Sequence, residues 1–268
     1  MSYESEKVLQ DIALRELAAL GYSKLGSNMD INDLWDNFFI QTELLNIAQL
    51  PNGLNPNERN RLMESLPLTI RDSHNVLRNG LTLTLDNNKV INLYFFDKHD
   101  LTNNTFQVVE ELTVQGVSKN RLDLVILING IPVTNIELKR KGVASGVDEA
   151  INQINRYNKA AVYRQGLLKF LQIFVVSNNV FTKYFAVSPR AEQNESYSKS
   201  FFWTDEHNVR INDISTFIKA FFNKDQLTKT IRDYIIITPQ EESNEALILR
   251  PYQIFAVEKS KEILLNSD

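Results

Sequence analysis

The chain has 268 residues, 43% of them hydrophobic and 23% charged, a composition typical of a globular protein with one large domain or one domain and part of another. It has no cysteine, which excludes disulfides and thiolate metal sites and favours a reducing, cytoplasmic location. The spacing of its three histidines fits no zinc motif, so a bound metal would have mainly oxygen ligands, as Mg²⁺ and Mn²⁺ do. No apolar run is long enough to span a bilayer, and we expect no membrane association.

The net charge of −4 does not by itself indicate a nucleic-acid-binding protein, but the charge is unevenly distributed. Residues 1–58 carry nine acidic and three basic side chains, whereas residues 119–169 carry nine basic and four acidic ones. A basic segment suits a phosphate backbone, although a solvated face would show the same pattern.

Apolar spacing predicts helices in the first 66 residues, and alternation predicts strands after residue 80. We expect helices over 1–20, from 30 onward and over 56–66, then strands over 81–85, 90–97 and 106–114 in one sheet. Further along, we expect a helix opened by residues 145–148, strands over 170–179 and 182–188, and a helix over 214–222. This order predicts the α/β class, with a mixed central sheet flanked by helices on both faces.

The most apolar hairpin, NRLDLVILINGIPVTNIELKRKG at residues 120–142, contains the charged residues Asp123, Glu137 and Lys139. Its Asn-Gly pair is a strong turn signal. A two-residue turn with a regular ladder would place Asp123 opposite Ile136. A three-residue loop with a bulge, which better accommodates Pro132, would place Asp123 opposite Glu137, and we favour this register.

Two carboxylates at that distance repel each other unless a cation lies between them, and their oxygens suit Mg²⁺. The backbone carbonyl of Leu138 is a further candidate oxygen ligand. Lys139, on the same face as Glu137, would orient a water and offset charge on a phosphate. The alternative is a structural ion pair of Glu137 with Lys139 or Arg121 and no metal.

Gln153 and Tyr157 stand four residues apart on the helix that follows the hairpin, beside its buried stripe. They are either helix-edge polar groups that cover the core or part of the same site.

Several stretches together resemble the nuclease domain of the R subunit, the restriction and translocation subunit, of type I restriction-modification enzymes, which has the PD-(D/E)xK nuclease fold. The likeness covers most of the chain and is carried by YESE…LRELAALGY, DLVILINGIPVTNIELKRKG, EAINQINRYNK, LLKFLQIFVVSNN and LRPYQIFAVEKS.

The resemblance implies a restriction-endonuclease-like PD-(D/E)xK core in which Asp123 and Glu137 are metal ligands and Lys139 is the catalytic lysine. Gln153 and Tyr157 match the family's Gln-x-x-x-Tyr motif, which supports the active site and positions DNA. Glu6 lies where related nucleases often keep an acidic residue near the metal.

The resemblance also implies a division of the chain. Residues 1–238 would form the nuclease domain with a helical N-terminal part, and residues 239–268 a linker and the first helix of a truncated helicase-like motor. The motor's phosphate-binding loop, G-x-x-x-x-G-K-[Ser/Thr], does not occur in these 268 residues, so ATP would serve only the intact subunit. Tyr252 and Gln253 are then candidates for contact with adenine.

The function expected from this resemblance is Mg²⁺-dependent cleavage of duplex DNA, with Mn²⁺ as a substitute, in a complex with methyltransferase and specificity subunits. The candidate phosphate contacts are Lys119, Arg121, Arg140 and Lys141. Two alternatives are a repair-type nuclease of the same fold and a non-catalytic DNA or subunit docking module.

Overall fold

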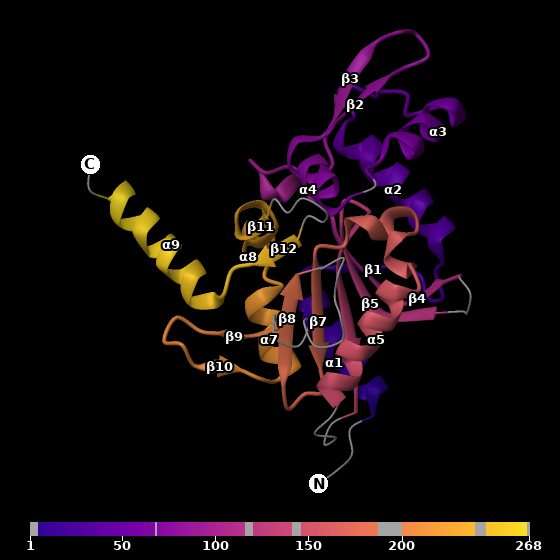
Figure 1. Ribbon diagram of the computed structural model, residues 1–268. Helices are drawn as coiled ribbons and strands as arrows, with labels where there is room; N and C mark the ends of the chain where they lie inside the picture. The colour runs from indigo at the N-terminus through magenta and orange to yellow at the C-terminus, as the bar shows by residue number, and fades with distance from the viewer. Residues whose placement is uncertain are drawn as a thin grey trace.

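An eight-stranded mixed sheet forms the centre of the molecule (Figure 1). The structure is a computed structural model and describes residues 5–67, 69–115, 120–140, 146–186, 200–238 and 245–266. Two neighbouring pairs, β1 with β4 and β6 with β7, are parallel, and the other pairs are antiparallel. In spatial order the strands are β1 (Ser23–Lys24), β4 (Phe106–Val114), β5 (Asn120–Ile128), β6 (Ile131–Leu138), β7 (Ile173–Ser177), β8 (Thr182–Ala186), β9 (Phe201–Thr204) and β10 (Arg210–Ile211).

Helices cover both faces of this sheet, with α5 in front of it and α1 and α7 behind it in Figure 1. The predicted α/β class and mixed sheet are therefore confirmed. The helices are α1 (Glu6–Ala19), α2 (Ile31–Leu45), α3 (Pro56–Ser65), α4 (Ile70–Asn79), α5 (Gly146–Lys159), α7 (Ile214–Phe221), α8 (Lys224–Lys229) and α9 (Pro251–Leu265). Short helical turns lie at η1 (Leu101–Asn103), η2 (Val162–Arg164), η3 (Gly166–Phe170) and the π-helical η4 (Thr230–Tyr234).

Two hairpins lie outside the central sheet. Within the described residues, the strands β2 (Leu81–Thr84) and β3 (Val90–Leu93) pair only with each other, and so do β11 (Ile235–Thr238) and β12 (Glu245–Ile248). The prediction that residues 81–97 belong to the same sheet as β4 is wrong. Alternation identified these strands, but it carries no information about which strand each one pairs with.

The central hairpin has a different turn from the predicted one but the predicted register. Ile128 pairs with Ile131, so the loop is a two-residue turn and not a three-residue loop. A bulge follows, because Leu127 pairs with Pro132 whereas Ile126 pairs with Thr134. Val133 is the extra residue, and beyond it Leu124 pairs with Ile136, which sets Asp123 opposite Glu137.

The strand β6 lies in the middle of the core, and all eight of its residues are buried. On one side α5 packs its apolar stripe against β6 and β7, as its spacing predicts. On the other side α1 contacts β6 and α7. The polar side chains on β6 are therefore enclosed and must find partners within the protein or in a ligand. The stripe of α5 consists of Val147, Ala150, Ile151 and Ile154.

The turn between β5 and β6 depends on Gly130, and replacing it with alanine should lower the free energy of unfolding by about 2 to 4 kcal/mol. Gly130 has φ +79°, and a Cβ there would lie 2.8 Å from Phe38 Cα and 3.1 Å from Phe38 N of α2. The backbone atoms of α2 cannot move aside as a flexible side chain would. Urea unfolding measures the difference. Gly26→Ala is the control, because its Cβ would meet nothing closer than Met29 Cγ at 4.0 Å. Equal stabilities for the two variants would contradict the prediction.

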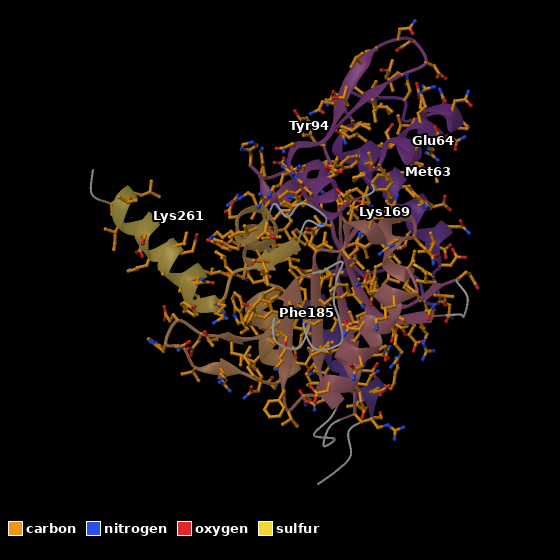
Figure 2. The ribbon with its side chains drawn as sticks, viewed as in Figure 1. Met63, Glu64, Tyr94, Lys169, Phe185 and Lys261 are labelled. Carbon is orange, nitrogen blue, oxygen red and sulfur yellow. The ribbon has the colours of Figure 1, made fainter. Side chains whose placement is uncertain are left out.

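The helix α9 projects from the body of the molecule in Figure 1, and Figure 2 shows Lys261 on it. In the ranges that the structure describes, no helix has both the length and the apolar character needed to cross a bilayer.

Candidate active site

Two carboxyl groups meet across β5 and β6. Asp123 and Glu137 lie opposite each other, close enough for the charge of Asp123 to act on Glu137. The backbone N–H of Leu138 donates to Asp123 Oδ2 at 2.8 Å, which holds this carboxyl against the end of β6. Glu137 is 0% exposed, whereas Asp123 keeps partial exposure, so the pair leads from the core toward solvent.

Both carboxyl groups are held in a state that favours protonation. Burial raises the pKa of Asp123, and burial followed by the negative charge of Asp123 raises the pKa of Glu137 well above its ordinary value. The positive charge of Lys139 lowers both pKa values but does not cancel the burial. Without a cation, the pair therefore holds a proton more tightly than two isolated carboxyl groups would.

The pair has the chemistry of a Mg²⁺ site. A divalent cation between two carboxylates removes their repulsion and allows both to ionise. Mg²⁺ commonly uses one or two carboxylates, and water and substrate phosphate complete its coordination. Asp123 and Glu137 could supply these two ligands, so the donor set fits the ion.

Glu6 lies next to this pair at the start of α1. Its negative charge contributes to the raised pKa of Asp123, after burial as the main cause. Among the described residues, however, no group of three or more histidine, aspartate or glutamate side chains has a metal-binding arrangement. Glu6 is thus a neighbour of the pair and does not extend it to a three-carboxylate cluster.

Lys139 follows directly after β6, where its backbone N–H donates to the Ser177 carbonyl at 2.9 Å. Its charge reaches both carboxyl groups. No ion pair joins Glu137 to Lys139 or Arg121 in the part of the chain that the structure describes, and Arg121 instead pairs with Glu111 at 3.3 Å. The structure therefore contradicts the alternative in which Glu137 forms a structural ion pair with Lys139 or Arg121.

Gln153 and Tyr157 contact the site directly. Gln153 Nε2 donates to Glu137 Oε2 at 2.7 Å and to Tyr157 Oη at 2.9 Å. The Tyr157 hydroxyl donates to the Arg121 carbonyl at 3.2 Å on β5. The two residues tie α5 to both strands of the hairpin, and the reading of them as polar groups that only cover the core is incomplete.

Sequence reasoning missed two residues beneath Glu137. Asn135 Nδ2 donates to Glu137 Oε1 at 3.1 Å and to Tyr163 Oη at 3.1 Å, and both Asn135 and Tyr163 are buried. An amide two residues before Glu137, on the same face of an apolar strand, was a usable signal for Asn135. The sequence contains no comparable signal for Tyr163, because this residue lies in the short turn η2 after α5.

The backbone is unusual at the point of β4 that faces Asp123. The register of β4 and β5 pairs Glu110 with Leu124 and Leu112 with Leu122, so Glu111 lies opposite Asp123. Glu111 has φ +56°, a conformation that is rare for a residue other than glycine. Such outliers concentrate at functional sites, and this one was not predicted from the sequence.

The candidate phosphate contacts are only partly described. Arg121 and Arg140 are exposed near the site. Lys119 and Lys141 lie outside the described residues.

The candidate adenine contacts lie on α9, away from the carboxylate pair. Tyr252 is 54% exposed, and the Gln253 side chain accepts a hydrogen bond from the Arg250 N–H at the start of the helix. Gln253 thus has a helix-capping role.

Comparison with known proteins gives a consistent result. The family described as "Type I restriction enzyme R protein N terminus" matches residues 3–193. The chain is 36% identical over 263 residues to the type I restriction enzyme SauCOLORF180P endonuclease subunit of Staphylococcus aureus strain COL, a match that covers 96% of this chain and 27% of the relative.

Two further relatives are more distant. The type I restriction enzyme EcoprrI endonuclease subunit of Escherichia coli is 31% identical over 267 residues, covering 96% of this chain and 82% of the relative. The putative type I restriction enzyme MjaVIIIP endonuclease subunit of Methanocaldococcus jannaschii is 29% identical over 196 residues, covering 71% of this chain and 18% of the relative. The chain thus spans about a quarter of the length of the S. aureus subunit.

Proposed function

Because this chain belongs to the family of type I restriction enzyme R proteins, as part of their N-terminal region, we propose that it is the nuclease part of a restriction endonuclease subunit. In this proposal it cleaves duplex DNA by Mg²⁺-dependent hydrolysis of a phosphodiester, with Mn²⁺ able to replace Mg²⁺. The names of the relatives favour a restriction enzyme over a repair nuclease of the same fold.

One observation carries the proposal, namely that the buried carboxyl group of Glu137 and the partly exposed one of Asp123 lie opposite each other on β6 and β5, within reach of the charge of Lys139. A like-charged pair inside a core lowers the stability of the folded protein. Its presence therefore indicates a function that requires it. The hydrogen bonds from Gln153 and Asn135 hold Glu137 in one orientation, as expected for a preorganised site.

Each residue then has a role in the proposed reaction. Asp123 and Glu137 would hold the Mg²⁺, with the Leu138 carbonyl as a further oxygen ligand, and the bound ion would supply charge stabilisation for a phosphate. Lys139 would orient the attacking water and offset the negative charge that develops on the phosphate oxygens. Gln153 would keep Glu137 in place, and Tyr157 would connect this contact to β5.

In this proposal, basic side chains around the site bind DNA that the other subunits of the complex bring to it. Arg121, Arg140, Lys119 and Lys141 would contact phosphates without reading the base sequence. Methyltransferase and specificity subunits would select the site on the DNA. We also propose that residues 1–238 form the nuclease domain and that residues 239–268 lead into an ATP-dependent motor, where Tyr252 and Gln253 would lie close to the nucleotide.

The experiment that tests this function first is a calorimetric titration with Mn²⁺. The parent protein should bind Mn²⁺ saturably, and both Asp123→Ala and Glu137→Ala should abolish the binding, because each removes one of two ligands. Glu43→Ala is the matched control, since Glu43 pairs with Arg59 on the distant α2–α3 segment. Unchanged binding in the two site variants, or none in the parent even with duplex DNA present, would refute the metal site.

A further inference from the structure

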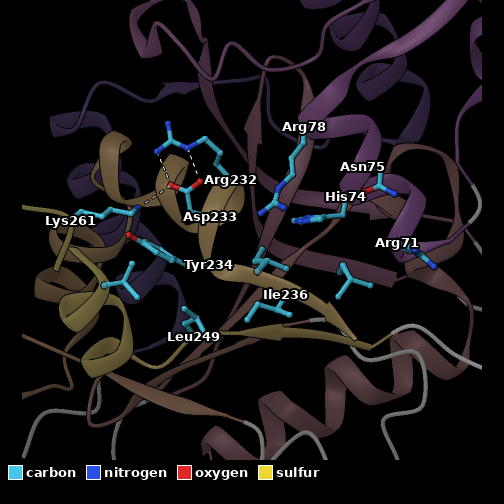
Figure 3. A pocket seen from close by; sticks show the side chains of 13 residues that line it. Arg71, His74, Asn75, Arg78, Arg232, Asp233, Tyr234, Ile236, Leu249 and Lys261 are labelled. Carbon is cyan, nitrogen blue, oxygen red and sulfur yellow. Dashed lines mark hydrogen bonds and ion pairs between the residues drawn. The ribbon is translucent and has the colours of Figure 1, made fainter. Parts of the chain in front are cut away.

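A groove with a volume of about 690 Å³ lies between α4 on one side and η4, β11 and α9 on the other (Figure 3). This volume lies within the range of sites that bind small molecules. Its apolar part comes from three consecutive isoleucines, together with Leu249 and Val257. Its polar part comes from four cations and one carboxylate, together with three neutral polar side chains, namely Arg71, Arg78, Arg232, Lys261, Asp233, His74, Asn75 and Tyr234. The isoleucines are Ile235, Ile236 and Ile237.

The cations on the two walls differ in how they are neutralised. On one wall, Arg232 binds Asp233 through two hydrogen bonds of 2.9 and 2.7 Å, and Lys261 pairs with Glu258 at 3.1 Å. On the α4 wall, Arg71 and Arg78 form no ion pair with any described residue, although Arg78 donates to the Ile231 carbonyl at 3.3 Å. The α4 wall therefore has positive charge available for an anion.

His74, one helical turn before Arg78, adds a hydrogen-bond acceptor. It is 2% exposed, and burial followed by the charge of Arg78 lowers its pKa to about 4, so the ring is neutral. Gln172 Nε2 donates to the Phe170 carbonyl, so Gln172 Oε1 accepts from His74 Nδ1 at 3.2 Å. The other ring nitrogen, Nε2, then carries the lone pair.

Buried polar atoms on this wall lack partners. His74 Nε2 and Arg78 Nε are both buried, and neither forms a hydrogen bond within the described residues. Figure 3 shows both side chains extending from α4 toward the segment that carries Arg232 and Tyr234. An unsatisfied buried polar group destabilises the folded protein, and a ligand that supplies a hydrogen-bond partner would offset that cost.

We propose that this groove binds a nucleoside phosphate. Its phosphate would accept hydrogen bonds from Arg78 and lie in the field of Arg71, and a sugar hydroxyl would donate to His74 Nε2. The base would rest on the three isoleucines. A DNA backbone is the less suitable occupant, because phosphate contacts in a duplex use polar side chains and have no need of an apolar floor.

The test is a calorimetric titration of the whole chain with ADP in EDTA, which keeps the carboxylate pair free of metal. We expect saturable binding that Arg78→Gln weakens by at least about tenfold and Arg71→Gln by about threefold. Arg71 is exposed, so its variant keeps the test valid if Arg78→Gln unfolds. Adenosine and pyrophosphate should each bind at least about tenfold more weakly than ADP.

Lys259→Gln is the matched control, because it removes a charge from α9 at a side chain that pairs with Glu262 outside the groove. Asp123→Ala should leave ADP binding unchanged, which separates this proposal from the nuclease function. Three outcomes would overturn the proposal: no ADP binding, equal ADP binding by the parent and both arginine variants, or pyrophosphate binding as tight as that of ADP. Loss of DNA binding by Arg78→Gln without any ADP binding would assign the groove to a nucleic-acid backbone instead.

Discussion

Lys139→Ala should lower the rate of Mg²⁺-dependent DNA cleavage by about 10³-fold while leaving Mn²⁺ binding unchanged. The two carboxyl groups would still hold the ion, because both ligands remain. Loss of the Lys139 charge raises their pKa values but also removes its repulsion of the cation, so the two effects oppose each other. What is lost is the positive charge beside the reacting phosphate and the group that orients the water. The effect should therefore fall on the rate and not on metal affinity.

The measurement is single-turnover cleavage of supercoiled plasmid, with the substitution placed in the complete subunit assembled with its partners. Arg140→Ala is the control, since it removes a neighbouring exposed charge and should change the rate far less. A parental rate in Lys139→Ala would exclude the lysine from the chemistry. Loss of Mn²⁺ binding in this variant would show that the lysine supports the site structurally.

Asp123→Asn should stabilise the metal-free protein at about pH 8, by roughly 1 to 2 kcal/mol. The raised pKa values of Asp123 and Glu137 mean that the folded protein holds a proton more tightly than the unfolded chain does. Their contribution therefore favours folding least at high pH, and stability falls as pH rises above the ordinary carboxyl range. Asparagine removes the charge, still accepts from the Leu138 N–H and can donate to Glu137.

Thermal unfolding between about pH 5 and 9 in EDTA measures this effect. The parent should lose stability across the range, and Asp123→Asn should show a flatter profile. Added Mg²⁺ should stabilise the parent most at high pH, where both carboxyl groups ionise, and should not stabilise the variant. Asp36→Asn, the same change on the exposed face of α2, serves as the control. Parallel pH profiles for parent and Asp123→Asn would contradict the prediction.

The sequence predicts the two strands that carry the candidate site more reliably than the groups around it. Asp123 and Glu137 interrupt an apolar hairpin, and the pairing inferred from Pro132 brings them together even though the predicted loop is wrong. The position of Gln153 beside the site follows from its helical spacing relative to the buried stripe of α5. The position of Tyr163 cannot be predicted in this way, because it depends on how the chain turns after α5.

The groove is the part least accessible from the sequence. His74 and Arg232 lie on opposite walls but are more than a hundred residues apart in the chain, and no periodicity links them. Gln172, which determines the tautomer of His74, comes from a third segment. Contacts of this kind arise from tertiary packing and leave no local pattern.

The bulge at Val133 gives β6 one residue more than the facing stretch of β5 requires. A single deletion between the turn and Glu137 can be absorbed by closing the bulge into a regular ladder, which returns Glu137 to its place opposite Asp123. A single insertion in the same stretch cannot be compensated by closing the bulge. It would turn the carboxyl group of Glu137 to the other side of the sheet. The hairpin should therefore accept length variation in one direction only, and β6 can become shorter by one residue without separating the two carboxyl groups.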